Sequence, residues 1–205
     1  MNRSWAYKVN IPEGKSGPWE VKRFTVSEEE AEMSRLRSMF NGGRYVPAGE
    51  YTSLTRDGYL VMADTPDEIR DHREPIRRAV GDCLVNGLGL GMVVQGMFEI
   101  GNAQTVTVIE NSLDVISLVG SVLKARYPGR LIIHHQDAFD WKRPKDMRYN
   151  VVWHDIWDDI CADNLPEMAR LHRKYGHWCD WQGSWARSLC EKKRRESRRY
   201  HGVIM

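Results

Sequence analysis

The stretch 83–110, CLVNGLGLGMVVQGMFEIGNAQTVTVIE, is the most informative part of this chain about its fold. An apolar run leads into a turn with glycines at 87, 89 and 91, an apolar helical pattern follows, and a β-branched run ends at Glu110. This order predicts a strand, a tight turn, a helix and a second strand, with both strand ends at one edge of a sheet. A carboxylate at the end of the second strand can accept both hydroxyls of a ribose. The stretch therefore predicts a site for an adenosine-containing cofactor, although a glycine-rich turn alone can be only a tight connection.

The spacing of the glycines separates two kinds of cofactor. The dinucleotide fingerprint G-x-G-x-x-G needs a glycine at position 92, where this chain has Met92. The glycines fall instead as G-x-G-x-G. That spacing resembles motif I of class I S-adenosylmethionine (SAM) methyltransferases, and the resemblance implies SAM as the cofactor.

From residue 80 onward the sequence alternates between strand and helix patterns. Such alternation predicts an α/β fold, a mostly parallel Rossmann-like sheet covered on both faces. Only one short strand, 177–181, is expected near the end, so the sheet should lack the last two strands of a methyltransferase. The other expected strands are 83–86, 105–110, 130–135 and 149–154, and the expected helices are 91–100, 112–126, 163–175 and 185–199.

Residues 1–79 are expected to form an N-terminal extension of helix and β-hairpin. Ser27 and Glu30 form a capping box, and Asp-Gly at 57–58 is a hairpin signal. Thr65 should cap a further helix that Pro75 kinks or breaks. The expected elements of this extension are a helix at 27–40, strands at 50–55 and 59–63, and a helix from 66. The SAM-binding domain then covers 80–186, and a basic C-terminal helix or tail covers 187–205.

Acidic residues follow two further strands of the predicted sheet. Asp137-Ala138 comes after the third strand, and Asp155 and Asp158 follow the fourth. Each acid alone could cap a helix. Because ligands of open α/β sheets bind beyond the carboxyl ends of the strands, Glu110, Asp137 and Asp155 are expected to converge there.

Residues 55–160 resemble the spermidine synthase branch of the SAM-binding superfamily. Its patterns L-D-G-x-x-Q, D-E-x-x-Y-H-E and Y-D-x-I-x-x-D-x-x-D-P correspond to segments that begin at Arg56, Asp67 and Tyr149. By this resemblance Glu110 holds the ribose, Asp137 the adenine, and Asp155 or Asp158 meets the amine acceptor and acts as base. The cofactor-binding residues implied are Gly87, Leu88, Gly89, Gly91, Glu110, Asn111, Asp137, Ala138 and Asp155.

The departures from that family fall at positions that hold the aminopropyl group and the polyamine. Leu90 replaces the acid of the family's G-G-G-D-G loop, Val61 replaces the glutamine, and Asp159 replaces the proline. The Y-H-E triplet is absent. These changes leave the nucleoside site intact and weaken the case for aminopropyl transfer.

Histidines and tryptophans near the fourth strand have competing interpretations. His154 is expected as an auxiliary base, because its unperturbed pKa suits proton transfer near neutrality. No metal site is expected, since His134 and His135 point to opposite faces of a strand. Most tryptophans between 153 and 185 are expected to cover the sheet edge, with Trp157 as the exception that reaches the acceptor.

Composition indicates a soluble cytoplasmic protein. The 205 residues carry a net charge of +2, no apolar run spans a membrane, and the four cysteines show no C-x-x-C pairing. Basic residues gather at 187–200, so a nucleic-acid partner is conceivable there but is not favoured over a solvated helix. The absence of N-P-P-Y after the fourth strand disfavours base methylation in DNA. The sequence is compatible with a homodimer and does not determine the oligomeric state.

The sequence thus predicts a SAM-dependent transferase, foremost a methyltransferase for a small-molecule or amine-bearing acceptor. Asp155, Asp158 and His154 are its expected catalytic residues. The alternatives are a spermidine synthase-like aminopropyltransferase and a non-catalytic SAM-binding regulatory protein.

Overall fold

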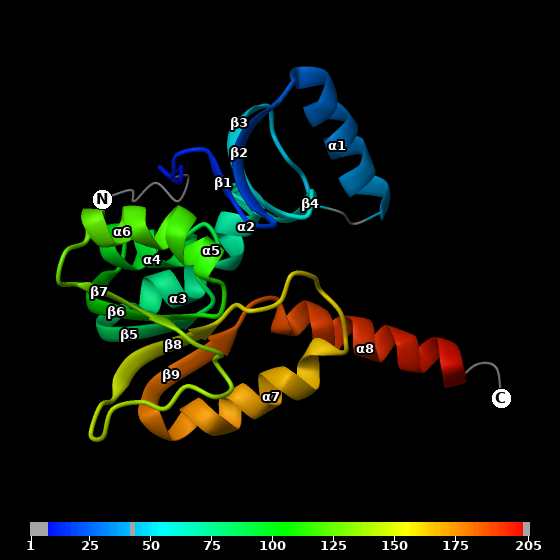
Figure 1. Cartoon of the computed structure of the whole chain (residues 1–205). Helices are drawn as coiled ribbons and strands as arrows, with labels where there is room; N and C mark the ends of the chain where they lie inside the picture. The colour runs from blue at the N-terminus through cyan, green and yellow to red at the C-terminus, as the bar shows by residue number, and fades with distance from the viewer. Residues whose placement is uncertain (1–7, 42–43, 203–205) are drawn as a thin grey trace.

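The computed structural model describes residues 8–41 and 44–202, which form a small antiparallel sheet packed beside a larger parallel one (Figure 1). The large sheet has the strand order β7-β6-β5-β8-β9, and every neighbouring pair is parallel. Counted along the domain this order is 3-2-1-4-5, the order of doubly wound nucleotide-binding sheets. The strands are β5 (Val80–Asn86), β6 (Asn102–Glu110), β7 (Leu131–His135), β8 (Tyr149–His154) and β9 (Cys179–Ser184).

This arrangement confirms the predicted α/β class and the shortened sheet. Among the described residues the sheet ends at β9, without the antiparallel strands that close a methyltransferase sheet. The predicted strand at 177–181 lies two or three residues further on, because a short 3₁₀ turn, Gly176–Trp178, precedes β9.

Helices cover both faces of the parallel sheet. In Figure 1, α4 (Met92–Glu99), α5 (Leu113–Val115) and α6 (Ser121–Arg126) lie above it and α7 (Asn164–Tyr175) lies below. A π-helical turn, Ile116–Gly120, joins α5 to α6, and α8 (Arg187–Gly202) extends away from the body. Cys83 and Val85 pack in the core above the sheet while Leu84 packs below, as the two-residue period of a strand requires.

The N-terminal extension is a four-stranded antiparallel sheet in the order β1-β2-β3-β4. The predicted hairpin is confirmed as β3 (Gly49–Arg56) and β4 (Tyr59–Ala63), and its turn residues Asp57 and Gly58 have φ of 52° and 81°. Positive φ at both central positions is what a two-residue hairpin turn needs. The sequence reading missed β1 (Gly14–Ser16) and β2 (Trp19–Val26).

The first helix of the extension begins as predicted, and the second differs from the prediction. α1 (Glu28–Asn41) begins with the predicted capping box, because the Ser27 hydroxyl accepts from the Glu30 amide at 3.2 Å and a Glu30 carboxylate oxygen accepts from the Ser27 amide at 2.8 Å. The second helix was predicted wrongly in two respects. Thr65 makes no side-chain cap, and the helix breaks at His72 into α2 (Pro66–Asp71) and α3 (Arg73–Arg78). Pro75 lies in the first turn of α3, where a missing N–H costs nothing.

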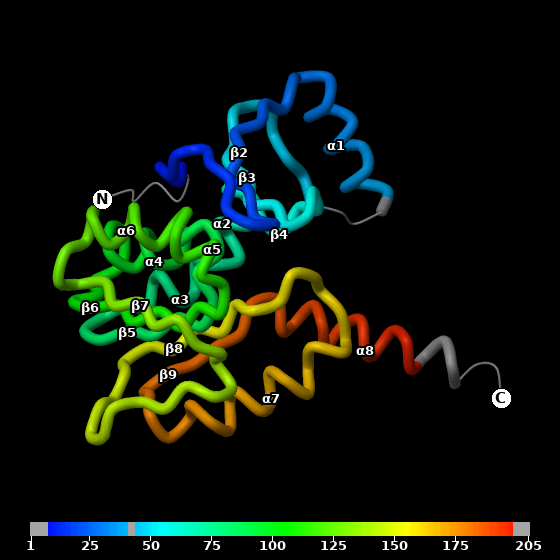
Figure 2. The backbone as a smooth tube through the Cα atoms, viewed as in Figure 1, coloured from blue at the N-terminus to red at the C-terminus, as the bar shows by residue number. Residues whose placement is uncertain are grey.

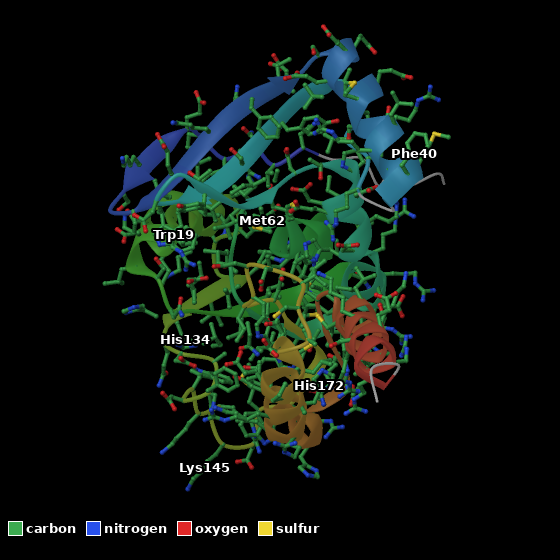
Figure 3. The ribbon with its side chains drawn as sticks, turned by 90° about the vertical axis from the view of Figure 1, so that its right-hand side faces the viewer. Trp19, Phe40, Met62, His134, Lys145 and His172 are labelled. Carbon is green, nitrogen blue, oxygen red and sulfur yellow. The ribbon has the colours of Figure 1, made fainter. Side chains whose placement is uncertain are left out.

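The small sheet lies against the glycine turn of the large domain through β4. The backbone path in Figure 2 shows β4 at the side of the small sheet that faces the parallel domain, and Met62 lies between the two sheets in Figure 3. The Leu90 amide donates to the Met62 sulfur at 3.1 Å. Arg56, at the end of β3, forms an ion pair with Asp158. The extension therefore forms one wall of the site described next.

Candidate cofactor-binding and active site

A cavity of about 1090 Å³, the main cavity, lies at the carboxyl edge of the parallel sheet, beneath the N-terminal hairpin. Residues from the glycine turn, from the ends of β6, β7 and β8, from the hairpin and from α8 line it. The predicted site residues that line it are Gly87, Gly89, Glu110, Asn111, Asp137, Ala138, Asp155 and Asp158. The expected convergence of acids from three strand ends is therefore present.

The glycine turn has a backbone that other residues would adopt only with strain. Gly87, Gly89 and Gly91 have φ of 91°, 50° and 71°. A Cβ on Gly87 would lie 2.0 Å from the carbonyl oxygen of Asp155, and one on Gly89 would lie 2.3 Å from the Met62 sulfur. Gly91 packs against Leu123 and does not line the main cavity. The first two glycines therefore shape the cavity, and the third lets α4 pack against α6.

Glu110 is held rigidly at the end of β6. Its Oε2 accepts from the Leu88 amide at 2.8 Å and its Oε1 accepts from the Ser112 amide at 2.8 Å. Burial raises the pKa of Glu110, and these backbone donors oppose the rise. A carboxylate has about four acceptor sites, and the Asn111 amide also interacts with it, so at least one site remains for a ligand. Leu88 contributes its amide to this arrangement, and its side chain is buried away from the cavity.

The Asp137-Ala138 pair after β7 is also fixed by hydrogen bonds. Asp137 Oδ1 accepts from the Phe139 amide at 2.6 Å, and the Ala138 carbonyl accepts from the Tyr175 hydroxyl at 2.8 Å. The second oxygen of Asp137 is available on the exposed side of the turn. Both residues line the main cavity. An adenine amino group could reach a carboxylate held in this way.

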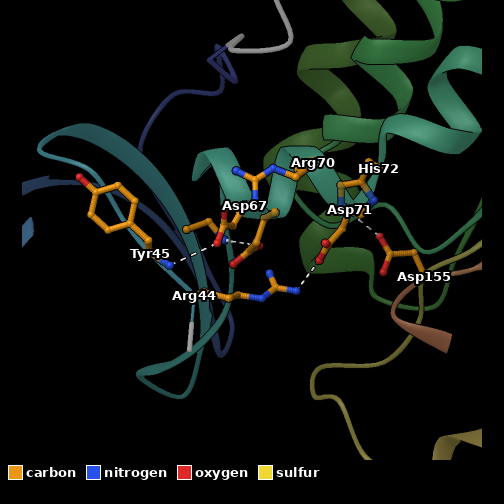
Figure 4. A network of polar contacts seen from close by, with 9 residues as sticks. Arg44, Tyr45, Asp67, Arg70, Asp71, His72 and Asp155 are labelled. Carbon is orange, nitrogen blue, oxygen red and sulfur yellow. Dashed lines mark hydrogen bonds and ion pairs between the residues drawn. The ribbon is translucent and has the colours of Figure 1, made fainter. Parts of the chain in front are cut away.

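A second group of ionisable residues surrounds Asp155, shown in Figure 4. His72 Nε2 lies 3.8 Å from Asp155 Oδ2, and the His72 ring is 1 % exposed. Burial, followed by the charge of Glu68 and then of Asp71, raises the pKa of Asp155 to about 7. Burial also raises the pKa of Glu68 to about 7 and lowers that of His72 to about 3. The main cavity thus contains two carboxyl groups that titrate near neutrality beside an uncharged imidazole.

His72 has an unfilled hydrogen-bonding position. Its Nδ1 is buried and has no hydrogen-bond partner among the described residues, and the residue lines the main cavity. A buried polar atom without a partner costs free energy, and such atoms often mark places where a ligand or water binds. The sequence reading missed His72. In the pattern D-E-x-x-Y-H-E it stands at the histidine, five residues after Asp67, so this position of the triplet is retained and could have indicated it.

His154, in contrast, does not reach the main cavity, and its predicted role as auxiliary base is corrected here. The ring is fully buried, with Nδ1 2.7 Å from the Asn86 amide nitrogen and Nε2 3.2 Å from the Gln182 oxygen. Burial lowers its pKa to about 3. The ring packs against Tyr175 of α7, on the face of the sheet away from the hairpin. It is therefore a structural residue of the core.

Asp158 and Trp157 lie at the outer wall of the main cavity. Asp158 is exposed and is paired with Arg56, whose guanidinium lies 5.3 Å from the centre of the Trp19 ring. Trp157 lines the cavity as predicted, and its indole N–H donates to Glu167 at 2.8 Å. Trp185 also lines it, which the sequence reading missed. Trp181, on the edge strand β9, stacks on Trp153 of β8 with ring centres 6.3 Å apart.

The lining of the main cavity is acidic. Six carboxyl groups and three cations line the cavity, a formal excess of three negative charges. The cations are Arg44, Arg56 and Lys193. The acids are Glu68, Glu110, Asp137, Asp155, Asp158 and Asp159. Such a cavity favours positively charged ligands and disfavours phosphates.

The part of the chain that the structure describes lacks two kinds of feature. No group of three or more His, Cys, Asp or Glu side chains there is arranged to hold a metal ion. No helix there is long and apolar enough to cross a membrane.

Comparison with known proteins gives similarity of structure and none of sequence. No protein-family model matches the chain, and no curated protein matches its sequence. Among solved structures, the N-methyltransferase NodS from Bradyrhizobium japonicum WM9 matches 62 % of this chain and 73 % of its own, with 12 % identity and a TM-score of 0.46. The 23S rRNA methyltransferase ErmE matches 56 % of this chain with 12 % identity and a TM-score of 0.44. The methyltransferase CcbJ from Streptomyces caelestis matches 54 % with 19 % identity and a TM-score of 0.41.

The match spans less than half the length of two of these proteins, 43 % of ErmE and 45 % of CcbJ. At such identities and scores, the function must be inferred from the site itself.

Proposed function

We propose that this protein is a SAM-dependent methyltransferase that acts on a small, amine-bearing acceptor. One observation carries the proposal: the glycine turn, Glu110 and the Asp137-Ala138 pair all open on the main cavity. In this assignment Glu110 accepts from the ribose hydroxyls, Asp137 accepts from the adenine amino group, and Gly87 and Gly89 let the backbone approach the nucleoside. The acidic lining also suits the positive charge of a sulfonium.

The acceptor amine enters beside Asp155. An amine that arrives as an ammonium gives one proton to the Asp155 carboxylate, and its free nitrogen lone pair then attacks the methyl carbon. Bound SAM would supply the methyl group, so that the N–C bond would form as the S–CH₃ bond breaks. The electron pair of the broken bond would stay on sulfur, and S-adenosylhomocysteine would leave. Catalysis comes mainly from proximity and orientation, with proton removal as a further contribution. A carboxyl with a pKa near 7 is suited to this step close to neutral pH.

Aminopropyl transfer is the less favoured alternative. Val61 lines the main cavity at the position where the resembled family has a glutamine, so that polar contact with the aminopropyl group is missing. A non-catalytic SAM-binding protein is the remaining alternative, and the experiment below separates it from an enzyme.

The test combines a binding and a transfer measurement. SAM should bind saturably by calorimetry while NAD does not, and label from methyl-labelled SAM should pass to at least one member of a panel of primary amines and diamines. Asp155→Asn keeps the shape of the side chain and removes its charge, so it should spare SAM affinity and lower turnover by about 10²–10⁴. SAM binding without any transfer would support the regulatory alternative, and no SAM binding would refute the proposal.

A further inference from the structure

A second cavity, the basic groove, has a charge opposite to that of the main cavity. It measures about 610 Å³ and lies between the loop that joins β7 to β8 and the end of α7. In Figure 3, Lys145 of this loop extends outward from the lower end of the molecule. The groove is lined by Phe139, Asp140, Trp141, Lys142, Arg143, Lys145, Lys174 and Trp178.

The positive charge of the groove is not neutralised within the protein. Four cations face one carboxylate, and among the described residues no carboxylate oxygen lies within 4.0 Å of any of the four. Two of the cations are held by backbone carbonyls instead. Lys174 donates to Phe139 at 2.7 Å and to Ala138 at 3.1 Å, and Arg143 donates to the Met147 carbonyl at 2.8 Å. Carbonyls fix the position of a cation without forming an ion pair with it. Burial lowers the pKa of Lys174, and the nearby carboxylate of Asp140 opposes that shift.

Aromatic rings alternate with these cations. The Arg143 guanidinium lies 5.2 Å from the centre of the half-buried Trp178 ring, and its buried Nε has no hydrogen-bond partner in the described chain. Phe139, also half-buried, has the Arg170 guanidinium 4.5 Å from its centre. Arg170 of α7, through this contact with a lining residue, adds a further cation next to the groove. Rings interleaved with unpaired cations match a polymer that carries one phosphate for each flat base.

We propose that the basic groove binds single-stranded nucleic acid through its phosphates, with bases stacked on Trp178 and Phe139. The proposal goes beyond the transferase function and does not depend on it. Phe139 lines both cavities, but the acidic lining of the main cavity repels phosphates, so the strand is confined to the groove. The nucleic acid is therefore a binding partner of the protein and not the methyl acceptor.

The experiment measures fluorescence anisotropy of a labelled 12-nucleotide oligothymidylate with the full chain, over a range of salt concentrations. The double variant Lys142→Glu, Lys145→Glu reverses two exposed charges of the groove. It should weaken binding at least 10-fold and make the log–log salt slope shallower by about 1.4, since each lost single-strand phosphate contact contributes about 0.7. Lys15→Glu, Lys124→Glu makes the same change of net charge at exposed sites outside the groove and should weaken binding far less.

Two competitors and a truncation complete the design. Unlabelled oligothymidylate should displace the probe, whereas a polyphosphate of equal charge, which has no bases, should displace it at least 10-fold less well. A chain that ends at residue 193 should keep most of the affinity. Three results would each overturn the proposal. The two double variants could lose the same affinity, polyphosphate could compete as well as oligothymidylate, or the truncated chain could lose binding while its groove is intact. SAM affinity of the groove variant should equal that of the parent.

Discussion

Glu110 shows how one side chain can both build a site and serve it. Its two oxygens hold the amides of Leu88 and Ser112, one on the glycine turn and one at the start of α5. The carboxylate thereby fixes the turn before any ligand arrives, and the residue also lines the main cavity. Preorganisation of this kind reduces the ordering that binding must bring about.

Glu110→Ala should weaken SAM binding by about 1.5–3 kcal/mol, the range for hydrogen bonds to a charged group. Calorimetric titration measures the loss, and Glu29→Ala, on the exposed face of α1, is the matched control. Because Ala also removes the acceptors of two amides, Glu110→Gln serves as a second variant that keeps an acceptor oxygen and should lose less. Parent-like affinity in a folded Glu110→Ala protein would show that the ribose binds elsewhere.

Glu68 makes the stability of the protein depend on pH. Its Oε2 accepts from the Ala63 amide at 3.0 Å, and burial raises its pKa to about 7. In the unfolded chain the carboxyl keeps an ordinary pKa of about 4.3. The folded state therefore binds more protons between these two values, so the free energy of unfolding falls as pH rises through this window and the loss is complete above about pH 7.

Glu68→Gln should remove this loss while keeping an oxygen for Ala63. The free energy of unfolding of the variant, minus that of the parent, should be about 1–3 kcal/mol larger at pH 8 than at pH 4.5. The size follows from about 1.4 kcal/mol for each unit by which the pKa is raised. Urea unfolding at the two pH values measures it. Glu28→Gln, an exposed change in α1, should show no such difference between the two conditions. An identical stability difference at both pH values would mean that Glu68 is not held neutral by burial.

At the scale of elements, the turn between β5 and α4 joins the two parts of the site. Gly87 lies against the backbone of Asp155, so the cofactor turn and the expected base are in direct contact. Any side chain at position 87 has to displace the end of β8. The break between α2 and α3 also brings a residue to Asp155, because His72 at the break lies beside Asp155 while Ile76 stays in the core.

Gly87→Ala should disrupt both functions of the cavity at once. Its Cβ would lie 2.0 Å from the Asp155 oxygen at a φ of 91°, whereas Gly129→Ala at a φ of 71° meets no atom within 4 Å. In both variants the strained backbone should lower the free energy of unfolding by about 1–3 kcal/mol. Only Gly87→Ala should lower SAM affinity and turnover in addition, as calorimetry and the transfer assay can measure. Equal behaviour of the two variants would show that the close approach at Gly87 has no role in the site.

In the molecule as a whole, α8 contributes to the wall of the main cavity and then extends from it as a basic helix. Its first half is anchored, since Cys190 is fully buried beside Leu165 and Met168 and Lys193 donates to the Ile160 carbonyl at 2.6 Å. Residues 194–198 are exposed. The helix thus has two halves with different physical environments.

Deleting 187–205 should lower the free energy of unfolding by about 2–4 kcal/mol, because it uncovers a small apolar core and removes the buried Cys190. Deleting 194–205 should change stability by less than about 0.5 kcal/mol, as exposed residues usually do. Denaturant unfolding compares the two truncations, and SAM titration of the shorter deletion should match the parent. Equal stability of the two truncated proteins would show that the first half of α8 is not anchored.

Local sequence was enough to predict the strand–turn–helix–strand unit, the capping box of α1, the β3–β4 hairpin and the acids at three strand ends. These features depend on neighbours in the chain, on the two-residue period of strands and on the φ that glycine allows. Which ionisable groups share the main cavity follows instead from the packing of distant segments. His154 is the last residue of β8 and points below the sheet, whereas Asp155 leaves the strand and meets His72 and Glu68 from a helix pair more than 80 residues earlier. Such a meeting depends on burial and packing between distant segments, and no local pattern specifies it.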